Sequence, residues 1–242
     1  MASIQDNKGY NQGFKPSRAL TIRMERRCDY MLSKMDIRSD TRILEIGCGT
    51  GLLSFLMARK SGCEVTGIDI CEPFIASANK EYNIGNLKFM CFDFTSKHEI
   101  DRFRCFGEYD YIVGNGILHH LYYRLEESLV NVRSMLKTPG KIVFLEPNVL
   151  NPYCFLIFKI ELLRRAANLD PLEMAFAKKS ILEVLEKAGY IDSEVLYRDF
   201  LLPNTPSFFV KPAIAIGTIA EKLPGLNRLA QSIYISASNG GK

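Results

Sequence analysis

The chain has 242 residues, of which 47% are hydrophobic and 24% are charged, an ordinary globular composition that supports one domain with insertions. Its 31 lysines and arginines and 27 acids leave a net charge of only +4, and a nucleic-acid-binding surface needs a stronger, more concentrated positive charge. Nucleic acid is therefore not expected as a partner. The one basic cluster, Arg23, Arg26 and Arg27, is predicted to be a solvated helix face, with a phosphate site as the alternative.

The seven cysteines are odd in number and form no C-x-x-C pair, which favours reduced, packed thiols and predicts no metal site. The N-terminal segment is polar and lacks the apolar core of a signal peptide, and no stretch of about 18 uncharged apolar residues occurs. These features predict a cytoplasmic protein without a membrane-spanning helix.

In chain order, five apolar runs suited to buried parallel strands alternate with helical patterns: "RILEIG", "EVTGIDI", "LKFMCFDF", "YDYIVGNG" and "KIVFLEPN". Residues 51–60 are predicted to form a helix closed by Gly62, and Pro73 suits the first turn of the next helix. "LYYRLEESLVNVRSMLKTPG" is expected to be one long helix that ends at residues 138–140. The alternation predicts an α/β fold, a doubly wound parallel sheet with helices on both faces.

After Asn148 this alternation stops. "LNPYCFLIFKIELLRRAANLD" predicts an inserted helix, "KKSILEVLEKAGY" an amphipathic helix, "SEVLYRDF" a sixth strand and "SIYISAS" a half-buried last strand. We expect an N-terminal helical cap over residues 1–38 and a main domain over 39–242, with insertions at about 149–170 and 201–228.

Three closely spaced glycines in "ILEIGCGTGLLS" follow the first predicted strand. Such glycines let the backbone turn tightly and let a ligand approach, so nucleotide-type cofactors are the usual occupants. The dinucleotide pattern G-x-G-x-x-G fails, because its last position falls on Leu52 or Ser54, and no G-K-[ST] follows as in a P-loop. A tight turn without a ligand is the alternative that the loop alone leaves open.

Three acids, Glu45, Asp69 and Asp93, end the first three predicted strands or lie close to their ends. An acid at the carboxyl end of a strand beside a glycine loop can accept hydrogen bonds from both hydroxyls of a ribose. Because the carboxyl ends of parallel strands meet at one edge, all three acids point to the crevice where open α/β sheets bind ligands.

These motifs resemble those of class I S-adenosylmethionine-dependent methyltransferases. "LEIGCGTG" matches the first motif of that family, "VTGIDI" the second, "CFDF" the third, "YDYIVGNGILHHL" the fourth and "LKTPGKIVFLEPN" the fifth, over about residues 25–150. The resemblance implies S-adenosyl-L-methionine as the cofactor. It also implies a Rossmann-like, mostly parallel seven-stranded sheet with an antiparallel last strand.

The resemblance further implies that ten residues near the strand ends line the cofactor. It assigns the methionine amine to Glu45, the amino-acid and ribose portion to Gly47, Cys48 and Gly49, the ribose hydroxyls to Asp69, the adenine to Ile70, Asp93 and Phe94, and the methionine end to Asn115 and Gly116. In this family the N-terminal segment often folds over the cofactor, which makes Tyr10, Phe14 and Arg18 further candidates.

Two adjacent histidines, His119 and His120, follow the fourth predicted strand at the crevice. Methyl transfer to a hydroxyl needs a base, and a positioned imidazole is the commonest one. Neighbouring side chains on a helix project about 100° apart, so at most one histidine faces the methyl group, and we favour His119. Local hydrogen bonding at a helix start is the alternative. Glu146 and Asn148 end the fifth strand and are candidates either for binding the acceptor or for capping the strand.

The fourth motif contains "GNGI" and not the [DNS]-P-P-[YF] of enzymes that methylate nucleic-acid bases. The predicted function is therefore methylation, at oxygen, of a small-molecule, saccharide or lipid-linked acceptor. A regulatory module that binds the cofactor without catalysis is the alternative. The apolar, proline-rich residues 201–228 are expected to pack on the back of the sheet or to form a substrate roof that contacts a membrane surface.

Overall fold

The computed structural model describes residues 17–103, 107–167 and 169–241, so Tyr10 and Phe14 lie outside the described residues. The strands are β1 (Arg42–Ile46), β2 (Glu64–Asp69), β3 (Leu87–Cys91), β4 (Tyr109–Asn115), β5 (Leu136–Pro147), β6 (Tyr190–Arg198) and β7 (Ser232–Asn239). The α-helices are α1 (Arg18–Leu32), α2 (Leu52–Ser61), α3 (Glu72–Glu81), α4 (Lys97–Phe103), α5 (Leu125–Arg133), α6 (Pro152–Lys159), α7 (Glu161–Ala166), α8 (Lys178–Lys187) and α9 (Val210–Ala220). The described residues also form three short 3₁₀ helices: η3 (Leu118–Arg124), η4 (Ser207–Phe209) and η5 (Leu226–Leu229).

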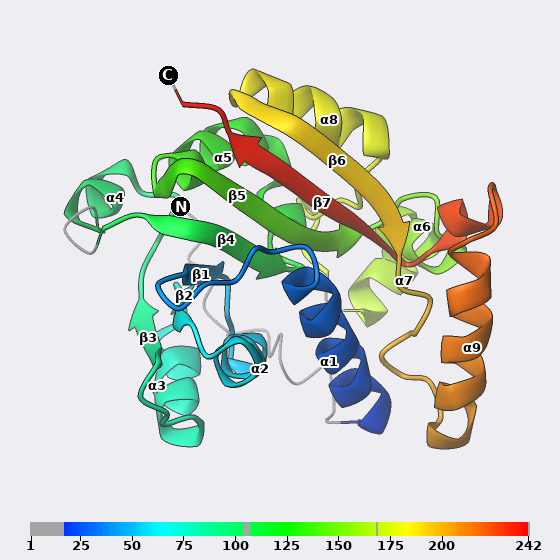
Figure 1. Ribbon diagram of the computed structural model, residues 1–242. Helices are drawn as coiled ribbons and strands as arrows, with labels where there is room; N and C mark the ends of the chain where they lie inside the picture. The colour runs from blue at the N-terminus through cyan, green and yellow to red at the C-terminus, as the bar shows by residue number, and fades with distance from the viewer. Residues whose placement is uncertain (1–16, 104–106, 168, 242) are drawn as a thin grey trace.

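The seven strands form one sheet in the order β3-β2-β1-β4-β5-β7-β6, in which β7 runs antiparallel to both of its neighbours (Figure 1). The predicted Rossmann-like sheet with an antiparallel last strand is confirmed. The expectation that β7 is half-buried is wrong. Both of its faces are covered, because Ile233 and Ile235 pack into the cluster on one side of the sheet and Tyr234 into the cluster on the other, and all three are fully buried.

Helices cover both faces of the sheet, as the alternation predicted (Figure 1). Along β1, Leu44 and Ile46 pack into the cluster that includes α5 and α8, whereas Ile43 packs on the other face with α1, α2 and α3. Strands covered on both faces read as continuous apolar runs, which is why these five strands were visible in the sequence.

Most local signals are confirmed, and two helix predictions are wrong. Gly62 closes α2 with φ +74°, and Pro73 lies in the first turn of α3. The long helix predicted to end at residues 138–140 stops at Arg133, because the chain enters β5 at Leu136, which pairs with Tyr109 of β4. The single predicted insertion helix is two helices, α6 and α7, because Ile160 between them has an extended backbone.

The insertion at 201–228 packs on α1. Leu201 and Val210 form a small buried cluster with Ala19, and the Ser17 hydroxyl donates to the Pro203 carbonyl at 2.9 Å. The interpretation that places this segment on the back of the sheet is therefore wrong for α9, which lies beside the N-terminal helix.

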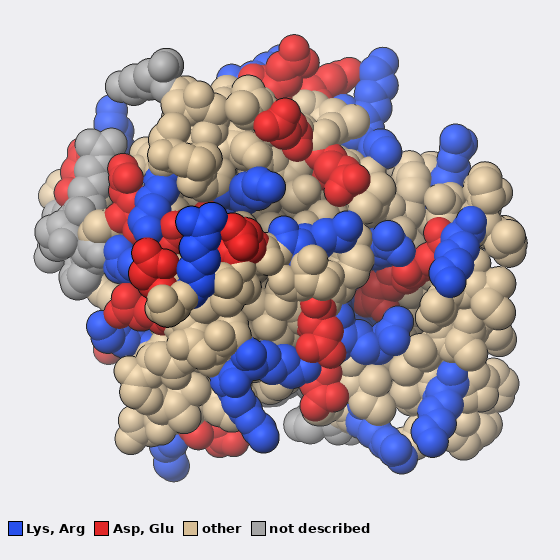
Figure 2. Space-filling model, viewed as in Figure 1, with Lys and Arg blue, Asp and Glu red and all other residues tan. Residues whose placement is uncertain are grey.

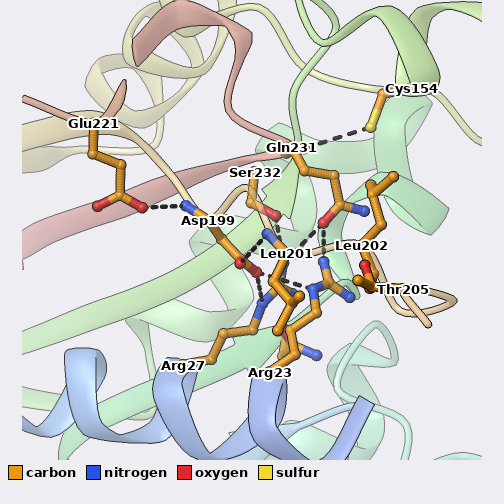
Figure 3. A network of polar contacts seen from close by, with 11 residues as sticks. Arg23, Arg27, Cys154, Asp199, Leu201, Leu202, Thr205, Glu221, Gln231 and Ser232 are labelled. Carbon is orange, nitrogen blue, oxygen red and sulfur yellow. Dashed lines mark hydrogen bonds and ion pairs between the residues drawn. The ribbon is translucent and has the colours of Figure 1, made fainter. Parts of the chain in front are cut away.

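A buried polar network around Asp199 fixes α1 to the sheet (Figure 3). The Asp199 carboxylate accepts hydrogen bonds from Arg27 Nε at 2.7 Å and Arg23 Nε at 2.9 Å, and both guanidinium groups also donate to Gln231. Burial opposes ionisation, but the charges of Arg27 and Arg23 lower the pKa of Asp199. Arg23 and Arg27 therefore do not form the solvated face that the sequence suggested, whereas Arg26 is exposed.

Replacing Asp199 by alanine should lower the free energy of unfolding by about 3–5 kcal/mol, because two buried guanidinium groups lose the carboxylate between them. Urea denaturation measures the loss. The matched control is Asp36→Ala, which removes an ion pair of 2.7 Å to Arg38 with both side chains more than two-thirds exposed. The control should leave the free energy of unfolding almost unchanged, because water screens an exposed ion pair. Equal losses in the two variants would contradict the structural role of Asp199.

Candidate cofactor and active site

The loop after β1 contains three glycines with positive φ, and they have two different reasons to be glycine. A Cβ at Gly47 would lie 2.5 Å from Ile117, and a Cβ at Gly51 would lie 2.5 Å from Phe89, so both positions are closely packed. At Gly49, with φ +52°, a Cβ would meet nothing within 4 Å. The backbone at Gly49 therefore borders open space, which a ligand can approach closely.

Asp69 ends β2 and holds this loop in place. Its carboxylate accepts one hydrogen bond from the Gly49 N–H and one from the Cys71 N–H, both at 2.9 Å. Burial raises the pKa of Asp69, and the two backbone hydrogen bonds counteract that rise. The side chain remains partly exposed at the carboxyl edge of the sheet. The acid that the sequence placed beside the glycine loop therefore contacts the loop directly.

Glu45 lies beneath the glycine loop on the central strand β1 and is 3% exposed. The Ser54 hydroxyl at the start of α2 donates a hydrogen bond to its carboxylate. Burial raises the pKa of Glu45 to about 8, against which the bond from Ser54 acts only in part. In the absence of a cation beside it, this carboxyl group holds a proton at neutral pH.

The other residues that the resemblance assigned to the cofactor differ in how open they are. Ile70 is 41% exposed, whereas Cys48 and Phe94 are buried and Phe94 belongs to the hydrophobic core. One carboxylate oxygen of Asp93 accepts from the backbone N–H and the hydroxyl of Thr95, at 2.8 and 2.6 Å. Because the side chain of Phe94 packs in the hydrophobic core, it offers little surface to a ligand.

Asn115 and Gly116 end β4 next to the glycine loop. The Asn115 side-chain oxygen accepts from Arg27 Nη1 at 2.5 Å, and Gly116 has φ +70°. The next residue, Ile117, is the one that a Cβ at Gly47 would touch. The loops after β1 and β4 therefore lie in contact, as the shared crevice requires.

Glu146, at the end of β5, binds the start of η3. Its carboxylate accepts from the backbone N–H groups of Ile117, Leu118 and His119 at 2.9, 2.8 and 3.3 Å, and it lies 3.0 Å from His119 Nδ1. The side chain is 1% exposed. These four partners use the carboxylate for capping and for orienting His119, so the acceptor-binding role predicted for Glu146 is not supported.

Asn148 is also fully occupied within the chain. Its amide group donates to the carbonyls of Arg228 and Ala230 at 2.8 and 2.7 Å, and its oxygen accepts from the Leu150 N–H at 3.0 Å. It is completely buried. Asn148 therefore ties the two insertions together, and the capping alternative describes it better than contact with an acceptor.

The two histidine rings lie side by side at a tilt of 32°, with centroids 4.1 Å apart, and each is bound to its own carboxylate. His120 Nδ1 lies 2.8 Å from Glu173, a buried residue that sequence reasoning missed because no local pattern marks it. Burial opposes the charged form of His120, but the hydrogen bond and charge of Glu173 outweigh it and raise the pKa. His119 also packs edge-on against Phe158 of α6, with ring centroids 6.1 Å apart.

His119, His120 and Glu173 each offer a ligand atom within 4.8 Å of the others, so the set could hold a metal ion. Sequence reasoning predicted no metal here. Together with Glu146, these side chains are equally well explained as two histidine–carboxylate pairs, because each imidazole already has a carboxylate at hydrogen-bonding distance from Nδ1.

Comparisons with known proteins agree with this geometry. A family model described as a methyltransferase domain matches residues 37–191. A malonyl-[acyl-carrier protein] O-methyltransferase of Bacillus cereus is 34% identical over 106 residues, which cover 43% of this chain and 36% of that relative. The chain thus spans little more than a third of the length of this curated relative.

Two solved structures have the same fold. A methyltransferase of Archaeoglobus fulgidus described as SAM-dependent matches with a TM-score of 0.61 at 23% identity, over 96% of this chain and 98% of its own. A Haemonchus contortus phosphoethanolamine N-methyltransferase in complex with S-adenosylhomocysteine matches with a TM-score of 0.62 at 15% identity, over 89% of this chain and 53% of its own.

The raised pKa of Glu45 makes a prediction about stability. The folded protein keeps this proton up to about pH 8, whereas the unfolded chain loses it near the ordinary value of 4.5. The folded state therefore binds more protons in this window, and stability falls as pH rises from about 4.5 to about 8. Glu45→Gln should abolish that fall, which amounts to a few kcal/mol at about 1.4 kcal/mol per pH unit.

Urea denaturation at pH 5.5 and pH 8.5 measures this difference. Glu126→Gln, which changes an exposed carboxyl on α5, is the matched control and should keep the pH dependence of the parent protein. If Glu45→Gln and the parent lose the same stability between the two pH values, Glu45 is ionised in the folded protein.

Proposed function

The chain belongs to the methyltransferase domain family, and on that premise we propose that it transfers the methyl group of S-adenosyl-L-methionine to an oxygen atom of a small or lipid-linked acceptor. The observation that carries the proposal is the His119–Glu146 pair, which lies on the loop that touches the glycine loop. An oriented imidazole beside the cofactor crevice is the group that a hydroxyl acceptor requires.

The glycine loop fits the proposed cofactor. The backbone at Gly49 borders open space that a side chain would fill, and the N-cap residue of α2, Gly51, offers no side-chain hydrogen bond to the first amides of that helix. Asp69 is partly exposed beside this space and can accept from ribose hydroxyls. Ile70 follows it with an exposed apolar side chain suited to the adenine face.

Glu45 would meet the positively charged amine of the cofactor's methionine portion. Because the buried carboxyl is protonated when no cation is present, contact with the amine would favour its ionised form. The roles of Cys48, Asp93 and Asn115 are proposed on their place at the strand ends. Cys48 and Gly47 would contribute backbone contacts, and Asn115 would border the methionine end while Arg27 holds it.

When bound, the cofactor supplies an electrophilic methyl group on a sulfonium. The chain's own task is to align the acceptor oxygen with that methyl group and to accept its proton. His119 Nδ1 faces Glu146, which leaves Nε2 to receive the proton from the acceptor hydroxyl. Phe158 of α6 covers the edge of this ring and helps to exclude water.

The acceptor class that we propose rests on the relatives of this chain. The similar Bacillus proteins are named for O-methylation of an acyl group on a carrier protein, which supports oxygen as the atom methylated. A match over only 68 residues, at 34% identity, links the chain to a ubiquinone biosynthesis O-methyltransferase of Neisseria meningitidis. Because that protein is named for the biosynthesis of a lipid-soluble quinone, the match supports an apolar acceptor as well. A saccharide acceptor and a cofactor-binding regulatory module are the other outcomes that an activity test must separate.

Incubation with cofactor labelled in the methyl group, followed by fractionation of acceptor extracts, tests the proposal directly. We expect label in the organic, lipid-containing fraction, in a methyl ether that withstands mild acid. Label confined to aqueous saccharide fractions would contradict the acceptor class. Cofactor binding without label in any fraction would favour the regulatory module.

The cofactor prediction is that S-adenosylhomocysteine binds in the micromolar range and NAD does not bind, since the loop has the wrong spacing for a dinucleotide. Asp69→Ala should weaken the homocysteine derivative by roughly 2–3 kcal/mol, because two hydrogen bonds to a charged acceptor are lost. Calorimetry measures both. Tight NAD binding without binding of the homocysteine derivative would overturn the cofactor assignment, and an unchanged Kd in Asp69→Ala would move the ribose elsewhere.

The base prediction is that His119→Ala lowers kcat by at least about 10²-fold while the Kd for S-adenosylhomocysteine changes little. The third histidine, His98, is exposed on α4 and provides the matched control, His98→Ala, which should be fully active. His120→Ala tests whether the neighbouring pair of His120 and Glu173 contributes to turnover. Parent-like turnover in both His119→Ala and His120→Ala would remove histidine from the mechanism.

A chelator separates a base from a metal ligand at the same residues. If His119 acts as a base, dialysis against EDTA leaves kcat unchanged. Loss of activity that Mn²⁺ or Zn²⁺ restores would instead assign the histidines and Glu173 to a metal site.

A further inference from the structure

The exposed apolar side chains of this protein are concentrated in its two insertions. Of 19 exposed large hydrophobic residues among the described ones, 15 lie within residues 150–172 and 208–229. Phe208 and Leu162 are the most exposed, at 78% and 77%. We call this surface the apolar face: Leu150, Tyr153, Phe155, Leu156, Ile160, Leu162, Leu163, Leu172, Phe208, Phe209, Ile216, Ile219, Leu223, Leu226 and Leu229.

The two insertions form one surface although 35 residues of chain separate the two ranges. The Asn151 side chain at the start of α6 donates to the Leu229 carbonyl at 2.7 Å, and the Cys154 thiol contacts the Gln231 carbonyl at 3.5 Å. A cavity of about 240 Å³ opens between them. It is lined by Tyr153 from one insertion and by Leu202, Pro203, Asn204, Thr205, Pro206 and Phe209 from the other.

Basic side chains outnumber acidic ones on these two segments, by six to three. Five basic side chains are exposed, Lys159, Arg165, Lys211, Lys222 and Arg228, against one exposed acid, Glu161, which pairs with Arg165. Of the other two acids, Glu221 is bound to Arg198 and Asp170 is half-buried. Figure 2, viewed as Figure 1, shows the side of α9 as mostly uncharged atoms with separate lysine and arginine side chains.

We propose that the apolar face docks onto an anionic lipid surface, with its short helices lying in the interface. Scattered aromatic and aliphatic side chains with basic residues beside them match this partner, because the apolar groups enter the acyl boundary while the charges meet anionic headgroups. None of the described helices is long and apolar enough to span a membrane, and α9 has only 11 residues.

Helix α6 contributes to the apolar face on one side and contacts His119 on the other. Phe158 of this helix faces inward against His119, whereas Phe155 and Leu156 point outward as part of the apolar face. Docking therefore brings the acyl boundary next to the wall of the candidate active site. Binding to lipid does not require methyl transfer, so the test below reads binding alone and stays interpretable if the proposed function fails.

Co-sedimentation of the full chain with vesicles of phosphatidylcholine containing phosphatidylglycerol tests the proposal. We expect the parent protein to pellet with these vesicles, and to pellet less with phosphatidylcholine alone or as salt increases. Phe208→Ser with Phe209→Ser should weaken binding at least about tenfold. Lys211→Glu with Lys222→Glu should weaken binding to the anionic vesicles by at least about 25-fold, at roughly fivefold for each positive charge lost.

The matched control is Tyr123→Ser with Ile191→Ser, two exposed apolar residues outside the apolar face, which should bind like the parent. The proposal is overturned if the parent stays in the supernatant with anionic vesicles, or if the control loses as much binding as the phenylalanine variant. It is also overturned if ultracentrifugation finds a parent dimer that the phenylalanine variant dissociates, since the face is then an interface between two copies. Binding to an acyl carrier protein without vesicle binding would likewise assign the face to a protein partner.

Discussion

The arrangement of the candidate active site depends on one buried carboxylate, that of Glu146. Three backbone amides at the start of η3 and the imidazole of His119 all point to it, so the turn out of β4 and the orientation of the histidine are fixed by the same group. A charged acceptor of hydrogen bonds is stronger than a neutral one, and its burial makes each lost partner costly. Glu146 lies at the end of β5 and its partners follow β4. The geometry of the candidate active site therefore depends on the relative positions of these two neighbouring strands.

The sheet could be predicted from the sequence because its strands are buried on both faces and its turns carry local signals. Gly62 and Pro73 mark helix ends through their own backbone preferences, and the glycine loop does so through its left-handed residues. The end of α5 could not be predicted this way. The helical pattern continues past Arg133, but residues from Leu136 onward gain strand pairing with Tyr109, a partner distant in sequence.

The candidate site residues also differ in whether their positions follow from the order of the strands or depend on partners distant in sequence. Asp69 and the glycines lie on strand ends whose order follows from the topology, so their meeting was predictable. Glu146 and Asn148 were placed correctly at a strand end, but their partners could not be predicted, because amides of η3 and carbonyls of Arg228 and Ala230 come from other parts of the chain. Glu173 and the burial of Arg27 are of this kind too, since a single acid or arginine in a sequence carries no sign of what surrounds it.

The insertions show what a non-local constraint does to surface composition. An apolar helix that packs only one side must bury its other side elsewhere or leave it in water, at a cost of roughly 25 cal/mol for each Å² of apolar surface. Here α6 uses Phe158 and Cys154 inside, and Asn148 and Asn151 hold the second insertion against it, so the shape of the two segments is fixed without using their outer side chains. Folding therefore gives no reason for Phe155, Leu162 and Phe208 to be apolar. A partner that removes these side chains from water explains why they are apolar. The basic residues beside them favour a partner that is negatively charged.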